Sequence, residues 1–110
     1  MKEEKAGRAA LHPDELRISG EKTAKMARHV PEWRLGEKEL EREFRLADFR
    51  SAIEFVTQVA DLAEEADHHP DISISYNKVR LVLSTHKAEG LSRKDFLLAA
   101  KIDRLAKREM

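Results

Sequence analysis

Residues 71–83 read DISISYNKVRLVL and carry the clearest structural signal in the chain. Apolar residues occupy alternate positions on each side of Asn77-Lys78, which is the period of half-buried strands. Asn tolerates positive φ, so a tight turn at Asn77-Lys78 predicts an antiparallel hairpin that pairs Tyr76 with Val79. The alternating apolar residues are Ile72, Ile74 and Tyr76 on the first strand and Val79, Leu81 and Leu83 on the second.

The segment before the hairpin, from about Asp48 to Ala66, has the periodicity of a helix. Its main apolar stripe comprises Phe49, Ala52, Ile53, Val56, Val59, Ala60 and Ala63. A second stripe, formed by Phe55, Leu62 and Ala66, lies about 100° around the helix from the first. Two interpretations stay open: either the helix is sunk between a sheet and another helix, or the second stripe contacts another subunit.

Weaker patterns predict the remaining elements: a short helix over 19–29, strands over 33–35 and 39–46, and a final helix over 93–107. Ser92 and Asp95, at the start of the final helix, have the spacing of a capping box with Asp in place of the usual Glu. The predicted order is helix, strand, strand, helix, strand, strand, helix. Residues 1–18 show no clear apolar stripe, so we expect a charged arm ahead of a single domain over 19–110.

The composition limits the classes of function. A chain of 110 residues makes one ordinary domain and is too short for a two-domain enzyme. The 21 Lys and Arg balance 21 Asp and Glu, so nucleic acid and membrane surfaces are not expected partners. The absence of cysteine excludes disulfides, thiolate metal sites and a cysteine nucleophile. No apolar run approaches the roughly 18 residues of a membrane span, and no signal peptide is recognisable, so a cytoplasmic protein is expected.

Three histidines are candidates for chemistry. His68 and His69 follow the long helix, and His86 lies just beyond the predicted hairpin. The hairpin register brings these imidazoles to one end of the sheet, where one could protonate a leaving oxygen while another removes a proton from a ring nitrogen. A metal site is less favoured, because no third ligand occurs at helical spacing. The alternative is that these histidines only cap the helix and bond the loop.

Further residues extend the histidine pattern over most of the chain. They are Ala63-Glu64, His68-His69-Pro70, Tyr76-Asn77-Lys78-Val79, Leu83-Ser84-Thr85-His86, Gly90-Leu91-Ser92 and Asp95, with Trp33 and Phe44–Phe49 upstream. From about Trp33 to Leu105 the chain resembles the pterin-4a-carbinolamine dehydratases. The resemblance implies an α+β fold, in which helices pack on one side of a four-stranded antiparallel sheet. It also implies a homodimer, commonly paired through helices into a homotetramer.

The resemblance also implies an activity. Members of the family remove water from a 4a-hydroxytetrahydropterin to give quinonoid dihydropterin, and thereby recycle the cofactor of aromatic amino-acid hydroxylases. No metal or redox cofactor is implied. His68 and His86 would transfer protons, and His69 would orient the substrate. The other pocket residues would be Glu64, Pro70, Thr85 and Trp33, with Glu64 one helical turn before His68 and within reach of it.

Relatives with binding roles provide an alternative to the enzyme. Some proteins of this fold act as a transcription-factor dimerisation partner in animals or as an assembly chaperone for Rubisco in bacteria, and fold alone does not decide function. The presence of His68, His69 and His86 together favours the enzyme. Lys87 departs from the family pattern, which has an acidic or small residue there, and it bears on substrate preference.

Overall fold

The computed structural model describes residues 20–85, 88 and 90–109. Helices and strands follow one another in the predicted order: α3 (Gly20–Ala27), β1 (Arg34–Leu35), β2 (Leu40–Arg45), α4 (Phe49–Ala66), β3 (Asp71–Ser75), β4 (Lys78–Leu83) and α5 (Arg93–Glu109). The arm predicted over residues 1–18 lies outside the described residues, so that boundary stays a prediction. No helix in the described ranges is long and apolar enough to cross a membrane.

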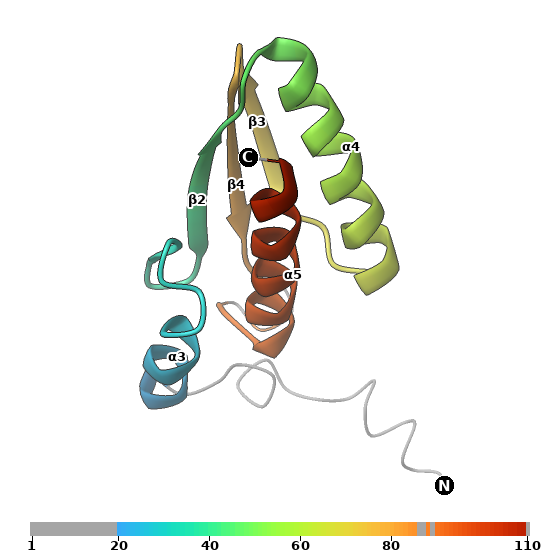
Figure 1. Cartoon of the computed structure of the whole chain (residues 1–110). Helices are drawn as coiled ribbons and strands as arrows, with labels where there is room; N and C mark the ends of the chain where they lie inside the picture. Colours follow the sequence, from blue (N-terminus) through green and yellow to red (C-terminus); the bar gives the residue numbers. More distant parts are fainter. Residues whose placement is uncertain (1–19, 86–87, 89, 110) are drawn as a thin grey trace, which may run out of the picture.

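The four strands form one antiparallel sheet in the order β1-β2-β4-β3. Helices α4 and α5 lie side by side on one face of this sheet (Figure 1). The α+β class and its four-stranded sheet are therefore confirmed. The strand β3 is an edge strand, and all of its residues are exposed.

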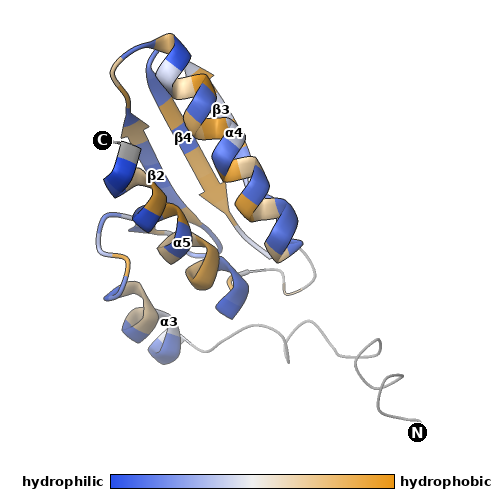
Figure 2. Ribbon diagram, turned by 45° about the vertical axis from the view of Figure 1, so that its right-hand side comes forward, coloured by the Kyte–Doolittle hydropathy of each residue, from blue (hydrophilic) through white to orange (hydrophobic). Residues whose placement is uncertain are grey.

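The core lies between the sheet and the helix layer. Alternation along β4 directs Val79, Leu81 and Leu83 toward the helices, and all three are fully buried. Phe44 of β2 meets Phe55 of α4 with ring centroids 5.0 Å apart. Figure 2 shows the apolar character of β4 beside the alternating apolar and polar bands of α4.

The buried face of α4 differs from the predicted main stripe. Ala52, Val59 and Ala63 are buried as predicted, but Phe49 and Ile53 are 52% and 39% exposed, and Ala60 is exposed. The buried stripe instead includes Phe55, and Leu62 and Ala66 are partly buried against the core. The helix is sunk between the sheet and α5, because Phe55 packs on Phe44 of β2 and α4 also contacts α5. The interpretation of Phe55 as a subunit contact is therefore wrong.

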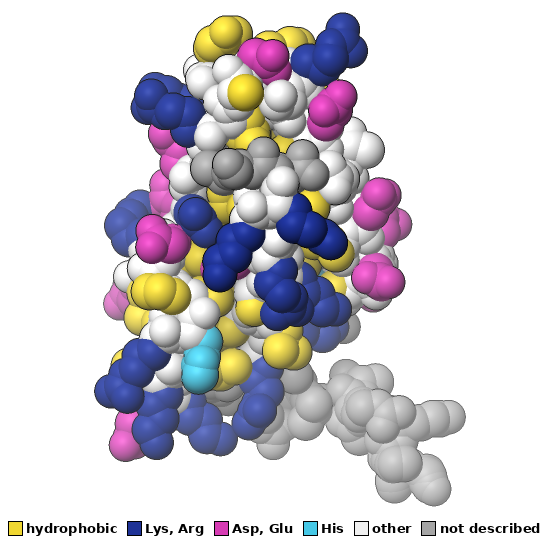
Figure 3. Space-filling model, viewed as in Figure 1, with side chains coloured by type: hydrophobic (Ala, Val, Ile, Leu, Met, Phe, Trp, Pro, Cys, Tyr) yellow, Lys and Arg dark blue, Asp and Glu magenta, His cyan; other side chains and the backbone are white. Residues whose placement is uncertain are grey.

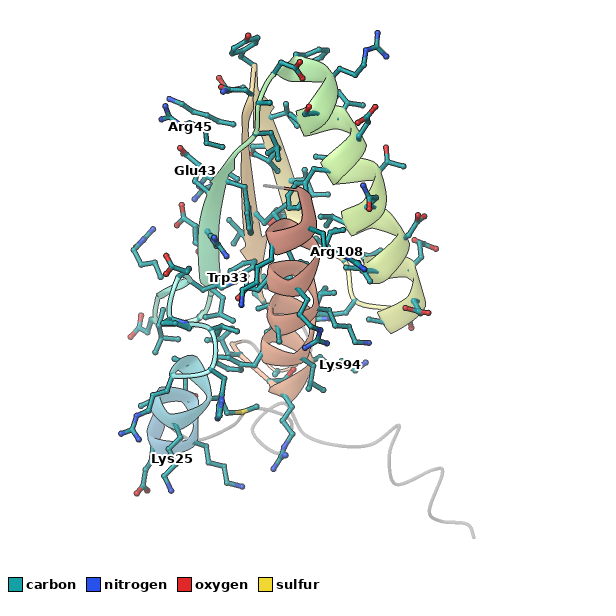
Figure 4. All side chains as sticks on the ribbon, viewed as in Figure 1. Lys25, Trp33, Glu43, Arg45, Lys94 and Arg108 are labelled. Carbon is teal, nitrogen blue, oxygen red and sulfur yellow. The ribbon has the colours of Figure 1, made fainter. Side chains whose placement is uncertain are left out.

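The opposite face of the sheet is polar. Glu43 and Arg45 of β2 point away from the helix layer (Figure 4). On the same face, Glu41 accepts hydrogen bonds from Arg34 and Arg80 on the neighbouring strands. The bond from Arg80 is the largest cause that lowers the pKa of the Glu41 carboxyl from its ordinary value of 4.5. These ion pairs suit a sheet face that none of the described helices covers.

The hairpin turn lies one residue earlier than predicted. Ser75 pairs with Lys78, so Tyr76 and Asn77 form the turn, and Tyr76 rather than Asn77 has a positive φ of 56°. Asn77 is held by the chain entering α4: its Nδ2 donates to the Leu46 carbonyl at 2.9 Å, and its carbonyl accepts from the Leu46 N–H at 2.8 Å. With Asn77 held by these two bonds, Tyr76 is the turn residue that adopts the positive φ. The pairing of β3 with β4 is therefore shifted by two residues from the predicted register. Because the shift is an even number, the same residues face the helices.

Candidate active site

The end of α4 directs the two adjacent histidines to different environments. Asp67 adopts the left-handed conformation (φ 52°, ψ 46°), and its N–H bonds back to the carbonyls of Ala63 and Glu64. The N–H of His68 also donates to Ala63, at 3.0 Å. This is a common way to end a helix, and it satisfies the last carbonyls while reversing the chain. The side chain of His68 is 10% exposed, whereas that of His69 is 58% exposed.

His68 binds a buried carboxylate. Its Nε2 lies 2.6 Å from Oδ1 of Asp95, which belongs to the first turn of α5 and is fully buried. The corrected hairpin register places Asp71 opposite Val82, so the loop before β3 lies near the end of β4, where α5 also begins. The residues that follow the C-terminal end of α4 therefore meet the N-terminal end of α5 at one end of the sheet.

The second carboxylate oxygen of Asp95 is also occupied. Oδ2 accepts hydrogen bonds from Thr85 Oγ1 at 2.7 Å and from the backbone N–H of Ser92 at 2.9 Å. The Ser92 contact is one half of the predicted capping box. The Ser92 hydroxyl does not complete the box, because it lies 2.7 Å from the Thr85 hydroxyl. Asp95 therefore holds α5, the residues after β4 and the histidine loop together.

This arrangement selects one form of His68. A carboxylate that accepts bonds from Thr85 and Ser92 is an acceptor toward His68 as well, so Nε2 carries the hydrogen. In the neutral imidazole the other nitrogen, Nδ1, then carries the lone pair. His68 can accept a proton at Nδ1 while Asp95 holds the ring in place, as in other histidine–carboxylate pairs.

Glu64 contacts the other histidine. Glu64 Oε2 lies 2.8 Å from Nε2 of His69, and both side chains are mainly exposed. The predicted bond from Glu64 to His68 is therefore wrong. The left-handed turn at Asp67 carries His68 beneath the helix end and leaves His69 beside Glu64. Pro70 follows as a half-buried residue just before β3.

Thr85 and His86 are neighbours in sequence, but only Thr85 is described. The Thr85 hydroxyl is joined to His68 through Asp95, and its N–H donates to the Gly90 carbonyl at 2.8 Å. His86 and Lys87 lie outside the described residues. Of the three histidines predicted to converge, the structure describes His68 and His69. It also describes Thr85, the residue before His86.

Trp33 lies in the core between β2 and α5 (Figure 4). Its Nε1 donates to Oδ1 of Asp103 at 2.7 Å, and Arg42 donates to the same oxygen at 2.7 Å. The indole also packs edge-on against Phe44, with ring centroids 6.0 Å apart. These contacts explain a structural role for Trp33, and its predicted place in a ligand pocket stays a prediction.

A groove of about 440 Å³ runs between α4 and α5 on the outside of the helix layer. Leu62 and Leu105 line it, so Leu62 of the predicted second stripe is partly covered within one chain. Figure 3 shows Lys and Arg side chains over α5 and acidic side chains at the α4 margin. The groove contains none of the predicted site residues. Within the described ranges, no three His, Cys, Asp or Glu side chains are placed to hold a metal ion.

A family model described as Pterin 4 alpha carbinolamine dehydratase matches residues 17–105. The chain belongs to this dehydratase family. A family member from Chloroflexus aurantiacus, provisionally named pterin-4-alpha-carbinolamine dehydratase, is 55% identical over 89 residues, which cover 81% of this chain and 96% of that protein. A relative from Rubrobacter xylanophilus with the same provisional name is 44% identical over 89 residues, covering 80% and 83% of the two chains.

Solved structures of pterin dehydratase relatives share the fold. A transcriptional coactivator/pterin dehydratase from Brucella melitensis superposes with a TM-score of 0.77 at 32% identity, covering 82% of this chain and 98% of its own. A pterin dehydratase-like protein identified as a RuBisCO assembly factor in the alpha-carboxysome has a TM-score of 0.60 at 26% identity, covering 71% and 93%. The chain is therefore similar both to a structure named as a coactivator/pterin dehydratase and to one named as a dehydratase-like assembly factor.

Asp95 is the site residue that the pattern of the sequence did not identify. Its spacing from Ser92 indicated a helix cap, and its place at the end of the matching run was the only other signal. The structure of this dehydratase-family chain shows that one carboxylate serves both purposes, because it caps α5 through Ser92 and binds His68.

Proposed function

We propose that this protein is a 4a-hydroxytetrahydropterin dehydratase that uses histidine acid–base catalysis. The observation that carries the proposal is the 2.6 Å contact between His68 Nε2 and the buried carboxylate of Asp95. A buried carboxylate that holds an imidazole in one tautomer is an arrangement suited to proton transfer. Membership of the dehydratase family supports the substrate class.

The reaction needs two proton transfers. The 4a-hydroxyl leaves as water when an acid protonates its oxygen and the carbon–oxygen bond breaks, and a base removes a proton from a ring nitrogen as the carbon–nitrogen double bond forms. We assign the base to Nδ1 of His68, because Asp95 binds the hydrogen on Nε2. On the family pattern we assign the acid to His86. His69, Glu64, Pro70, Thr85 and Trp33 remain proposed as substrate-positioning residues.

The setting proposed for this enzyme follows from its family. The chain would act as a homodimer or homotetramer in the cytoplasm, without a metal or redox cofactor. Its product would feed the recycling of tetrahydropterin for an aromatic amino-acid hydroxylase. A non-catalytic binding or assembly role is the second candidate, and the observation in its favour is the structural likeness to a protein named as a RuBisCO assembly factor.

The dehydration rate of a 4a-hydroxytetrahydropterin separates these candidates. The wild type should accelerate the reaction, and His68→Ala should lose at least about 100-fold of the acceleration, the usual contribution of general acid–base catalysis. His29→Ala is the matched control, because His29 is an exposed histidine just beyond α3, outside the His68–Asp95 contact. A wild-type rate equal to that of buffer would overturn the enzyme proposal and favour the binding role.

Circular dichroism should accompany the kinetics, since removal of His68 leaves Asp95 without one of its donors. His68→Gln serves as a second variant, because the amide can still donate a hydrogen bond but cannot exchange a proton near neutral pH. Folded His68→Gln with wild-type kcat would overturn the role of His68 as the base.

A further inference from the structure

The outer face of α5 is strongly basic. At about 100° per residue, all six cations of this helix fall within an arc of about 140° around its axis, and its three acidic residues lie outside that arc. All six cations are exposed, and Figure 3 shows the Lys and Arg side chains gathered over the helix. These six residues, called the basic stripe below, are Arg93, Lys94, Lys101, Arg104, Lys107 and Arg108.

The helix does not need the basic stripe for its own stability. Cations near the N-terminal end of a helix oppose its dipole, yet Arg93 and Lys94 begin α5. Only Lys107 and Arg108, in the last turn, complement the dipole. Within the described residues, no cation of the basic stripe takes part in an ion pair. The stripe is therefore available to bind an anion from outside the chain.

The zero net charge of the chain conceals the basic stripe. Six of the 21 Lys and Arg lie in it, so the other 15 are outnumbered by the 21 Asp and Glu. Two acids of α5 bind partners inside the fold, because Asp103 accepts from Trp33 and Arg42, and Asp95 is fully buried. The local concentration of one sign of charge sets the field that a partner meets. Net charge therefore does not exclude nucleic acid at this face.

We propose that the basic stripe binds the phosphate backbone of double-stranded nucleic acid. This binding is independent of the proposed dehydratase function, because no predicted site residue belongs to the stripe. Lys94 and Arg108, both labelled in Figure 4, lie about 21 Å apart along the helix at about 1.5 Å per residue. A duplex rises about 3.4 Å per base pair, so the stripe spans about six base pairs.

The composition of the arc favours nucleic acid over a protein or a membrane. Between its cations the arc contains only Leu97 and Ala100. Protein interfaces usually have an apolar core and few lysines, and a helix that lies in a membrane surface needs a broad apolar face. Interfaces with nucleic acid are instead polar and strongly positive. The arc has no aromatic residue on which the bases of a single strand could stack, so a duplex is the better partner.

The groove beside α4 limits which side of the stripe meets the duplex. Asp61 and Glu65 of α4 line this groove together with Lys101, Arg104 and Arg108. The two carboxylates repel phosphate, so the duplex contacts the part of the stripe that faces away from α4. The variant Asp61→Asn with Glu65→Gln should therefore bind a duplex more tightly than the wild type does. Weaker binding by this variant would overturn the electrostatic account.

Fluorescence anisotropy with a labelled DNA duplex tests the proposal on the full chain. A duplex of mixed sequence and about 20 base pairs is more than three times the length of the stripe. The Kd should be about 1–100 μM at physiological salt, which is the usual range for binding without sequence preference. It should weaken at least about 100-fold between about 50 and 200 mM salt, since four or more phosphates release counterions. No binding at the lower salt, or a Kd that ignores salt, would overturn the proposal.

Charge reversal tests whether the stripe carries the binding. Lys101→Glu with Arg104→Glu should weaken the Kd at least about 10-fold at low salt and reduce the salt slope by about 2. The matched control is Arg45→Glu with Lys78→Glu, an exposed pair of neighbours on β2 and β4. This control changes the net charge equally but leaves the stripe intact, so it should bind nearly as the wild type does. Equal losses in the two variants would show an effect of net charge alone and would overturn the stripe as the site.

Circular dichroism establishes that these variants are folded. Lys101→Gln with Arg104→Gln is a milder form of the reversal, because it removes both charges without adding carboxylates beside α4. It should also reduce the salt slope by about 2. A wild-type slope in the folded Gln variant would overturn the proposal, even if charge reversal unfolds the helix.

Two competitors separate nucleic acid from other anionic partners. Poly-L-glutamate at the same concentration of charges should displace the duplex less well than unlabelled DNA does. An extended acidic polypeptide has one charge per about 3.3 Å, whereas the duplex has one per about 1.7 Å. Vesicles of phosphatidylcholine and phosphatidylserine in equal parts should also compete weakly, because Leu97 is the only large apolar residue in the arc. Displacement by either competitor that equals displacement by DNA would overturn nucleic acid as the partner.

Discussion

Asp95 Oδ1 lies 2.6 Å from Nε2 of His68, although 27 residues separate the two in sequence. The carboxylate is fully buried, and it also accepts hydrogen bonds from Thr85 and from the backbone of Ser92. A single side chain thus caps α5, fixes the residues before His86 and holds the tautomer of His68. Changes at Asp95 should therefore affect the reaction as well as the fold.

The first prediction concerns Asp95→Asn. The amide keeps the shape of the side chain but can present an N–H to Nε2, which would favour the opposite tautomer of His68. We expect kcat to fall by about 100-fold or more and the pH profile of kcat to change, with a smaller effect on KM. Steady-state kinetics across pH would measure this. Ser92→Ala is the control, because it keeps the backbone N–H that binds Asp95; a wild-type pH profile in Asp95→Asn would refute the positioning role.

The second prediction concerns the stability provided by Thr85. Thr85→Val has nearly the same shape but removes the hydroxyl that donates to Asp95 at 2.7 Å. A hydrogen bond to a charged group contributes about 1.5–3 kcal/mol, so the free energy of unfolding should fall by that amount. Urea denaturation would measure the change. Thr57→Val removes a comparable hydroxyl bond on the exposed side of α4 and should cost less than about 0.5 kcal/mol; equal losses in the two variants would contradict the prediction.

The third prediction concerns Phe55. This ring is fully buried and lies 5.0 Å from that of Phe44, so Phe55→Ala should destabilise the fold by about 3–5 kcal/mol. Chemical denaturation at one fixed protein concentration would measure it, since oligomerisation makes stability depend on concentration. Leu97→Ala, at a residue 60% exposed on α5, is the control and should change stability little. A loss below about 1 kcal/mol for Phe55→Ala would contradict the core position.

The fourth prediction concerns acid. Asp48 caps α4 by accepting a hydrogen bond from the Ser51 N–H at 2.8 Å, and this bond lowers the pKa of its carboxyl from the ordinary value of 3.8. A carboxyl whose pKa is lower in the folded state adds stability above its unfolded pKa and loses it as pH falls through the folded pKa. Asp48→Asn caps without a titrating group, so its Tm should fall less than that of the wild type between pH 5 and pH 2. Parallel acid losses in the two proteins would show that Asp48 does not contribute.

Local periodicity was enough to predict the order of the elements. Alternation along β4 and the helical repeat of α4 depend only on residues close together in the chain, so their types and approximate ends follow from the sequence. The histidine motif likewise indicated the family, which the comparison with the family model confirms.

The orientation of α4 and the partner of His68 depended on contacts between distant elements. The sequence of a helix with apolar residues on two sides does not decide which side is buried. Packing against the sheet and α5 buried Phe55, which meets Phe44 of β2, and left Phe49 exposed. In the same way, the clamp of Asn77 on Leu46 set the hairpin register, and the left-handed Asp67 turned His68 toward Asp95 rather than Glu64. Local spacing determined which residues could bind one another, and the docking of α5 on the sheet determined which of them do.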